Sequence, residues 1–146
     1  MKKPGKSVGV ALATASAALL VLAAPAHAVV AAAGPGASSA GFATRVVVAP
    51  VGGSVTFVNG DLADHTLTAS EVYLPKKVAK KTAHCTGYPK KRCPLFTTGS
   101  IGSGDSGPVE GLNRIVAGRQ YPFICEIHSG MTGTLVAVGA APNSRR

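Results

Sequence analysis

The alternation of apolar and polar residues along this chain predicts a series of short β-strands. In residues 54–60 (SVTFVNG), Val55 and Phe57 fall on one face of an extended segment and Thr56 falls on the other. Further β-branched or aromatic segments lie at 44–50, 65–69, 71–75, 113–118, 119–125 and 133–138, with Gly- and Pro-containing turns between them. No segment after residue 28 has a convincing helical stripe. The pattern therefore favours an all-β domain, a sandwich or a barrel.

The two ends of the chain differ from this central pattern. Three lysines, an uncharged apolar run and the small-residue sequence AHA at 26–28 predict that residues 1–28 are a secretory signal peptide, cut after Ala28. No later apolar run is long enough to span a bilayer, so we expect an exported protein without an integral membrane segment. Residues 29–43 are small and low in complexity, which predicts a flexible leader. We expect the folded domain at 44–139 and a disordered tail at 140–146.

Basic residues gather in one part of the chain. The formal net charge of the 146 residues is +9. We interpret residues from about 74 to 107 as an insertion in the domain, and it contains a basic cluster from Lys76 to Arg92: Lys76, Lys77, Lys80, Lys81, Lys90, Lys91 and Arg92. This cluster is either a solvated surface or a patch for an acidic partner. It contains too few aromatic residues for a single-strand nucleic-acid platform, so no nucleic-acid partner is expected.

Soft metal ligands gather near the C-terminus. In the segment YPFICEIHSGM, Cys125 follows an aromatic strand, and His128 and Met131 come three and six residues later. Alternation places Cys125 on the same inward face as Tyr121 and Phe123, and the turn that follows would bring the three polar or sulfur-containing side chains together. His65 follows a strand and a polar turn, which makes it our candidate for a fourth ligand. Two imidazoles, a thiolate and a weak thioether are the ligands of a type 1 copper site.

These segments resemble the cupredoxins, the plastocyanin, azurin and amicyanin family. The resemblance rests on YPFIC, on Cys125-Glu126-Ile127-His128, on Met131 and on the stretch from Asn59 to His65. The two-residue gaps between Cys125, His128 and Met131 look like the short ligand loop of amicyanin. Several relatives have Pro where this chain has Ile127, and often Asn where it has Thr66. Both differences bear on how the ligand loops are held in place and not on which residues bind the metal.

The resemblance implies a fold, a cofactor and a role. It implies a Greek-key β-sandwich over residues 44–139 with one type 1 copper held by His65, Cys125, His128 and Met131. The implied role is a one-electron carrier between redox proteins, some of them acidic, and not an enzyme. The predicted signal peptide indicates a secreted or periplasmic location after its removal. Two other roles stay open: an extracytoplasmic copper-binding and delivery protein, and an immunoglobulin-like interaction module in which the Cys and His residues are incidental.

The other cysteines and histidines have structural interpretations. Cys85 and Cys93 bracket seven residues and are expected to form a disulfide, which leaves Cys125 as the odd thiol of three. His84 lies among lysines, where another cation is disfavoured, and we expect it to be solvated. Asp61 and Asp64 have the character of turn residues. No Cys-x-x-Cys-His haem motif and no hydrolytic constellation is present.

Overall fold

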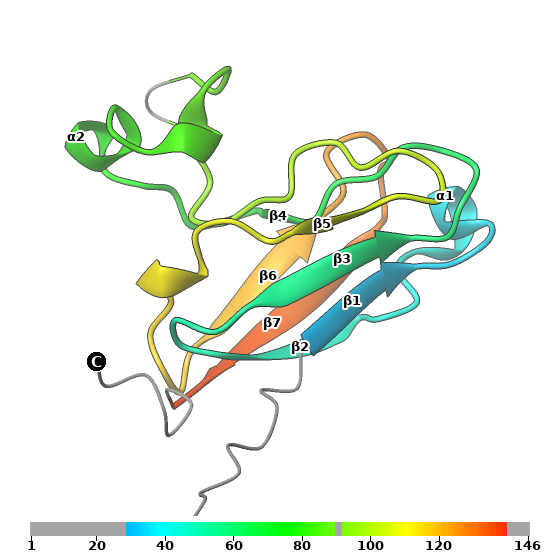
Figure 1. Ribbon diagram of the computed structural model, residues 1–146, viewed down its shortest axis with the longest axis horizontal. Coiled ribbons are helices and arrows are strands. Elements are labelled where there is room, and N and C mark those ends of the chain that lie inside the picture. The colour runs from blue at the N-terminus through cyan, green and yellow to red at the C-terminus, as the bar shows by residue number, and fades with distance from the viewer. Residues whose placement is uncertain (1–28, 90–91, 140–146) are drawn as a thin grey trace, which may run out of the picture.

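Two β-sheets packed face to face form the body of the protein in the computed structural model, which describes residues 29–89 and 92–139 (Figure 1). One sheet has the strand order β1-β3-β5 and the other β2-β7-β6-β4. The strands are β1 (Val29–Ala33), β2 (Val46–Pro50), β3 (Val55–Asn59), β4 (Thr68–Ala69), β5 (Ser106–Pro108), β6 (Gln120–Ile124) and β7 (Thr132–Val138). Short helical turns lie between them: α1 (Ala37–Ala40), α2 (Lys76–Ala79), η1 (Ala83–Cys85) and η2 (Leu112–Arg114). The prediction of an all-β sandwich is confirmed.

Alternate residues of the strands supply the core between the sheets. Val55 and Phe57 of β3 are buried while Thr56 is partly exposed, as the alternation predicts. Phe123 of β6 faces the same interior, and Phe42 packs edge-on against both phenylalanines at centroid distances of 6.1 Å and 5.1 Å. Such edge-to-face contacts between large rings are favourable, and they join the two layers at the centre of the sandwich.

The prediction of a flexible leader at 29–43 is wrong, because this segment is part of the fold. Residues Val29 to Ala33 form β1, which pairs in parallel with β3 from Val29 opposite Val55 to Ala33 opposite Asn59. Ala31, Ala33 and Ala37 are buried. Small side chains let this strand and the turn after it lie close against the core, so low side-chain volume here reflects tight packing. The folded domain thus includes residues 29–43, and the predicted signal peptide and tail lie outside the described residues.

Two local predictions are also wrong. Residues 113–118, expected as a strand, include the end of the turn η2, and the Tyr121 hydroxyl accepts a hydrogen bond from the backbone N–H of Val116 at 2.8 Å. Gly111 and Gly118 flank this segment with φ angles of 93° and 81°, which turn the chain away from extended pairing. Conversely, the Gly- and Ser-rich residues 97–107 (TTGSIGSGDSG), which are not among the predicted strands, lead into β5, which pairs antiparallel with β3. The backbone hydrogen bonds of β5 do not need alternating apolar and polar side chains, which is the pattern from which the strands are predicted.

The insertion is shorter than expected. The backbone N–H of Leu74 donates to the carbonyl of Cys93, and that of Leu95 donates to the carbonyl of Val72, both at 2.8 Å. These bonds close residues 75–93 into a lobe that projects from one side of the sandwich (Figure 1), and residues 94–107 return along the sheets. We call residues 75–93 the basic lobe. Its side chains Lys76, Lys77, Lys80, Lys81 and Arg92 are exposed, while Lys90 and Lys91 lie outside the described residues.

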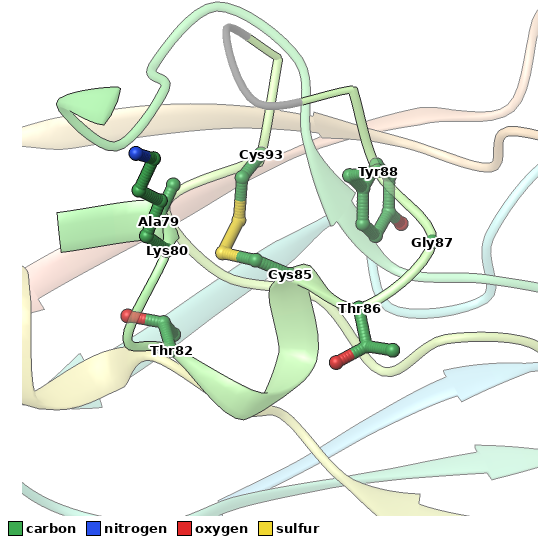
Figure 2. A pocket seen from close by; sticks show the side chains of 8 residues that line it. All are labelled: Ala79, Lys80, Thr82, Cys85, Thr86, Gly87, Tyr88 and Cys93. Atoms are coloured by element: carbon green, nitrogen blue, oxygen red, sulfur yellow. A yellow bond between two sulfur atoms is a disulfide. The ribbon is translucent and has the colours of Figure 1, made fainter. Parts of the chain in front are cut away.

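A disulfide between Cys85 and Cys93 holds the basic lobe together, as predicted. Both cysteines line a small pocket, and Figure 2 shows their bond between Lys80 and Thr82 on one side and Thr86 and Tyr88 on the other. Cys93 is fully buried, so the bond anchors the lobe to the core of the sandwich. No helix in the described residues is long and apolar enough to cross a membrane.

Candidate metal centre

Three side chains predicted as metal ligands meet at one end of the sandwich. Cys125 follows the last residue of β6, His128 lies in the loop between β6 and β7, and His65 lies in the segment between β3 and β4. The Cys125 Sγ atom lies 3.7 Å from the Nδ1 atoms of both His65 and His128. The two Nδ1 atoms lie 3.1 Å apart. Residues separated by 60 positions in the sequence therefore form a single cluster of one sulfur and two nitrogens.

The dimensions of this triangle fit a first-row transition metal. The point equidistant from the three atoms lies about 2 Å from each, close to the usual lengths of metal–imidazole and metal–thiolate bonds. Two ring nitrogens at hydrogen-bonding distance can share at most one proton, so at least one of them presents a lone pair. A thiolate with two neutral imidazoles is the donor set that copper favours in trigonal sites. The residues present thus fit the implied metal.

Backbone contacts fix the position of Cys125. Its N–H donates to the carbonyl of Met131 at 3.1 Å, which closes the β6–β7 loop. The Thr66 N–H donates to the Cys125 sulfur at 3.4 Å, which links the thiol to the His65 segment. Gly130 has a φ angle of 84°, a conformation that turns the loop back and that suits glycine. A Cβ atom at Gly133 would collide with the ring of Phe123, so this glycine is required for close packing beneath the loop.

The environment of Cys125 favours the thiolate. Burial alone would raise the pKa of the thiol, but the Thr66 N–H donates a hydrogen bond to the sulfur, and the Nδ1 atoms of His65 and His128 lie 3.7 Å from it. These contacts outweigh burial and lower the pKa of Cys125 to about 6. The thiolate is the form of cysteine that binds metals, so the protein provides it near neutral pH.

The two histidines differ in their surroundings. His65 is fully buried, and its backbone N–H and carbonyl both bond to Ile101. His128 is only half-buried, so it is the more exposed of the two. The Nε2 atom of His65 lies 2.8 Å from the Asp61 carboxylate, and within the described residues no hydrogen bond involves Nε2 of His128. Burial is the largest single influence and lowers the pKa of His65, but the contacts with Asp61 and Cys125 together outweigh it, so the pKa is raised.

Asp61 is the residue of the site that sequence reasoning missed. It was expected to be a turn residue, and its backbone does turn, with its N–H donating to Asn59 Oδ1. Its side chain, however, is buried and faces the ring of His65. The only signal in the sequence is an Asp four residues before a candidate ligand, which many exposed turns share.

Two candidate residues remain, and the structure places Met131 beside the cluster and His84 away from it. Met131 is buried, and its carbonyl accepts the N–H of Cys125, so it lies directly beside the cluster. Its role as the fourth ligand stays a prediction. His84 is not part of the site and is not fully solvated: its Nε2–H donates to the Pro94 carbonyl at 3.1 Å. It also lies near Cys85 and Cys93, but their sulfurs are joined in the disulfide and offer no thiolate.

Comparison with solved structures identifies the fold. A purple cupredoxin from Nitrosopumilus maritimus matches with a TM-score of 0.51 at 18% identity, over 74% of this chain and 97% of the other. Amicyanin from Paracoccus versutus matches at 16% identity over 78% and 84% of the two chains, with a TM-score of 0.48. Reduced auracyanin from Roseiflexus castenholzii matches at 22% identity over 75% and 94%, with a TM-score of 0.49. No family model and no curated protein sequence matches the chain. The match to the purple cupredoxin, with its TM-score above 0.5, shows that the protein has the cupredoxin fold.

Proposed function

We propose that this protein is an exported type 1 copper protein that carries single electrons between redox partners. The observation that carries the proposal is the convergence of Cys125 Sγ with the Nδ1 atoms of His65 and His128, on the cupredoxin fold. Met131 is buried and its carbonyl accepts the Cys125 N–H, and its thioether would supply the weak fourth ligand. An interaction module without a metal has no need of this arrangement, because a buried thiol and two imidazoles within 3.7 Å add nothing to a binding surface.

Each proposed ligand has a distinct task. A bound copper ion would supply the change between Cu(I) and Cu(II). The thiolate of Cys125 gives a strong bond and good electronic contact, and the imidazoles of His65 and His128 suit both oxidation states. The thioether of Met131 is a weak donor. The backbone hydrogen bonds between His65 and Ile101, and the one that the Cys125 N–H donates to the Met131 carbonyl, hold these groups in place before a metal arrives. This would keep the structural change between the two oxidation states small.

The surroundings of His128 suit brief contact with a partner. This imidazole is half-buried, and its neighbour Ile127 is 50% exposed. An exposed apolar side chain beside the accessible ligand would let a redox protein approach without forming a large interface. The basic lobe would favour acidic partners by long-range attraction. The predicted signal peptide at 1–28 supports action outside the cytoplasm.

Voltammetry distinguishes an electron carrier from a copper-delivery protein. For a carrier, the copper-loaded protein should give a reversible one-electron wave and retain its metal through repeated cycles. For a delivery protein, Cu(I) should pass readily to a competing chelator, and the wave should decay as the metal leaves. A stable wave with slow loss of Cu(I) supports the carrier, whereas rapid loss on reduction contradicts it.

A further inference from the structure

Asp61 makes a dense set of contacts at the inner side of the candidate metal centre. Its carboxylate accepts hydrogen bonds from the N–H groups of Gly36 and Leu62 at 2.9 Å each, and from the N–H and hydroxyl of Ser38 at 3.2 and 3.0 Å. The fifth contact is with His65 Nε2 at 2.8 Å. The exposed fractions of the His65 and Asp61 side chains are 0% and 7%, so water reaches neither ring nor carboxylate freely.

These contacts fix which nitrogen of His65 carries the proton. The N–H groups of Gly36 and Leu62 donate to Oδ1, and the N–H and hydroxyl of Ser38 donate to Oδ2. A carboxyl group whose two oxygens both accept hydrogen bonds from several donors is favoured in its ionised form. An ionised carboxylate can only accept, and Nε2 of His65 must therefore be the donor. In the neutral ring, a proton on Nε2 leaves a lone pair on Nδ1, the atom that lies 3.7 Å from the Cys125 Sγ atom and 3.1 Å from the His128 Nδ1 atom.

We propose that Asp61 is a positioning residue for the metal ligand His65, that it holds the ring in its Nε2–H tautomer, and that its charge favours the oxidised state of the site. This inference rests on the proposed copper function and assigns a role to a residue outside the ligand set. A carboxylate that accepts the second N–H of a metal-bound histidine fixes the orientation of the ring and makes it a stronger donor. A buried negative charge also stabilises the ion of higher positive charge.

The N-terminal segment has a function under this proposal. Two of the donors to Asp61, Gly36 and Ser38, lie between β1 and the end of α1. They hold the carboxylate in place and partly balance its charge. The segment that looks like a leader in the sequence therefore completes the surroundings of His65.

Asp64 provides a matched control for the test. It lies three residues later in the same loop, is exposed, and its carboxylate contacts only the Ser100 hydroxyl, at 3.4 Å, among the described residues. Asp61→Asn and Asp64→Asn each remove one negative charge near His65, but only the first removes the buried charge that faces the ring. The reduction potential of the copper-loaded variants is measured by voltammetry, and the tautomer of His65 in the metal-free protein is measured from the nitrogen chemical shifts of its ring.

The expected result is a selective effect of Asp61. Asp61→Asn should shift the equilibrium toward the reduced ion at least tenfold, which is about 59 mV for one electron, and Asp64→Asn should shift it less than twofold. Equal shifts in both variants would overturn the proposal. The metal-free wild-type protein should show the Nε2–H tautomer, and an Nδ1–H tautomer would overturn the proposal even if Asp61→Asn fails to fold. Because the second measurement needs no metal, a failure of the wild-type protein to bind copper would refute the proposed function without affecting the tautomer result.

Discussion

Removing the imidazole of His65 should affect the protein very differently from removing that of His128, because the two rings differ in burial. The side chain of His65 is 0% exposed, so His65→Ala leaves a cavity in the interior, for which truncations of large buried side chains typically cost about 2–5 kcal/mol. His128 is half-buried in a loop, so His128→Ala should change the free energy of unfolding by about 0.5 kcal/mol or less. In addition, His65→Ala leaves the Asp61 carboxylate without its histidine donor.

Two assays separate these effects. Urea unfolding of the metal-free variants measures the difference in stability. Copper binding in the presence of free imidazole measures access to the site, because a small ligand can enter the opening left by His128 from solvent. We expect imidazole to restore the intense visible absorption of copper-loaded His128→Ala but not that of His65→Ala. Equal losses of stability, or rescue of His65→Ala alone, would refute the assignment of His65 as the enclosed ligand and His128 as the accessible one.

Three further predictions concern the remaining features of the site. Met131→Leu should keep copper and colour but raise the reduction potential, since a weak donor is replaced by an apolar group, and a collapse of copper affinity would show a different role for Met131. The pKa of Cys125 is about 6 in the folded metal-free protein, against an ordinary value of 9.0. In unfolding experiments, the stability of wild type relative to Cys125→Ser should therefore rise between pH 6 and pH 9, be complete above pH 9 and be lost as the pH falls through 6. The absence of this pH-dependent gain would contradict a stabilised thiolate. A variant with Glu at four positions of the basic lobe, Lys76, Lys77, Lys80 and Lys81, should transfer electrons more slowly to an acidic redox protein. The rate should also depend less on salt, because exposed charges are screened over about 8 Å at physiological ionic strength. Equal rates and equal salt dependence in stopped-flow measurements would leave the lobe as a solvated surface.

The parts of the fold with strong side-chain alternation could be predicted from the sequence. Strand β3 has Val55 and Phe57 inward, and β6 has Tyr121 and Phe123 inward, so hydrophobic contrast identifies both. Strand β1 has no such contrast, because the buried Ala31 and Ala33 are as small as the residues of a linker. Strand β5, in a Gly- and Ser-rich stretch, is held by backbone pairing with β3 that leaves no trace in side-chain character.

The candidate site was predictable to the extent that its residues are close in sequence. The spacing of Cys125, His128 and Met131 after an aromatic strand indicates one loop, and a single upstream histidine after a polar turn completes the set. The contact between Asp61 and His65 was not predictable, since it depends on a carboxylate buried by Gly36 and Ser38, more than 20 positions earlier. Long-range hydrogen bonds of this kind follow from the packing of the two sheets and not from any local pattern.

Titration of the mature protein with Cu(II), followed by its visible spectrum, tests the central claim most directly. The intense band of a type 1 site requires charge transfer from a thiolate sulfur to copper. We expect wild type to develop this band at one copper ion per chain, and Cys125→Ser to lack it while keeping the circular dichroism of the β-sandwich. The absence of the band in correctly folded wild type, or its persistence in Cys125→Ser, would contradict the assignment of this site as a type 1 copper centre.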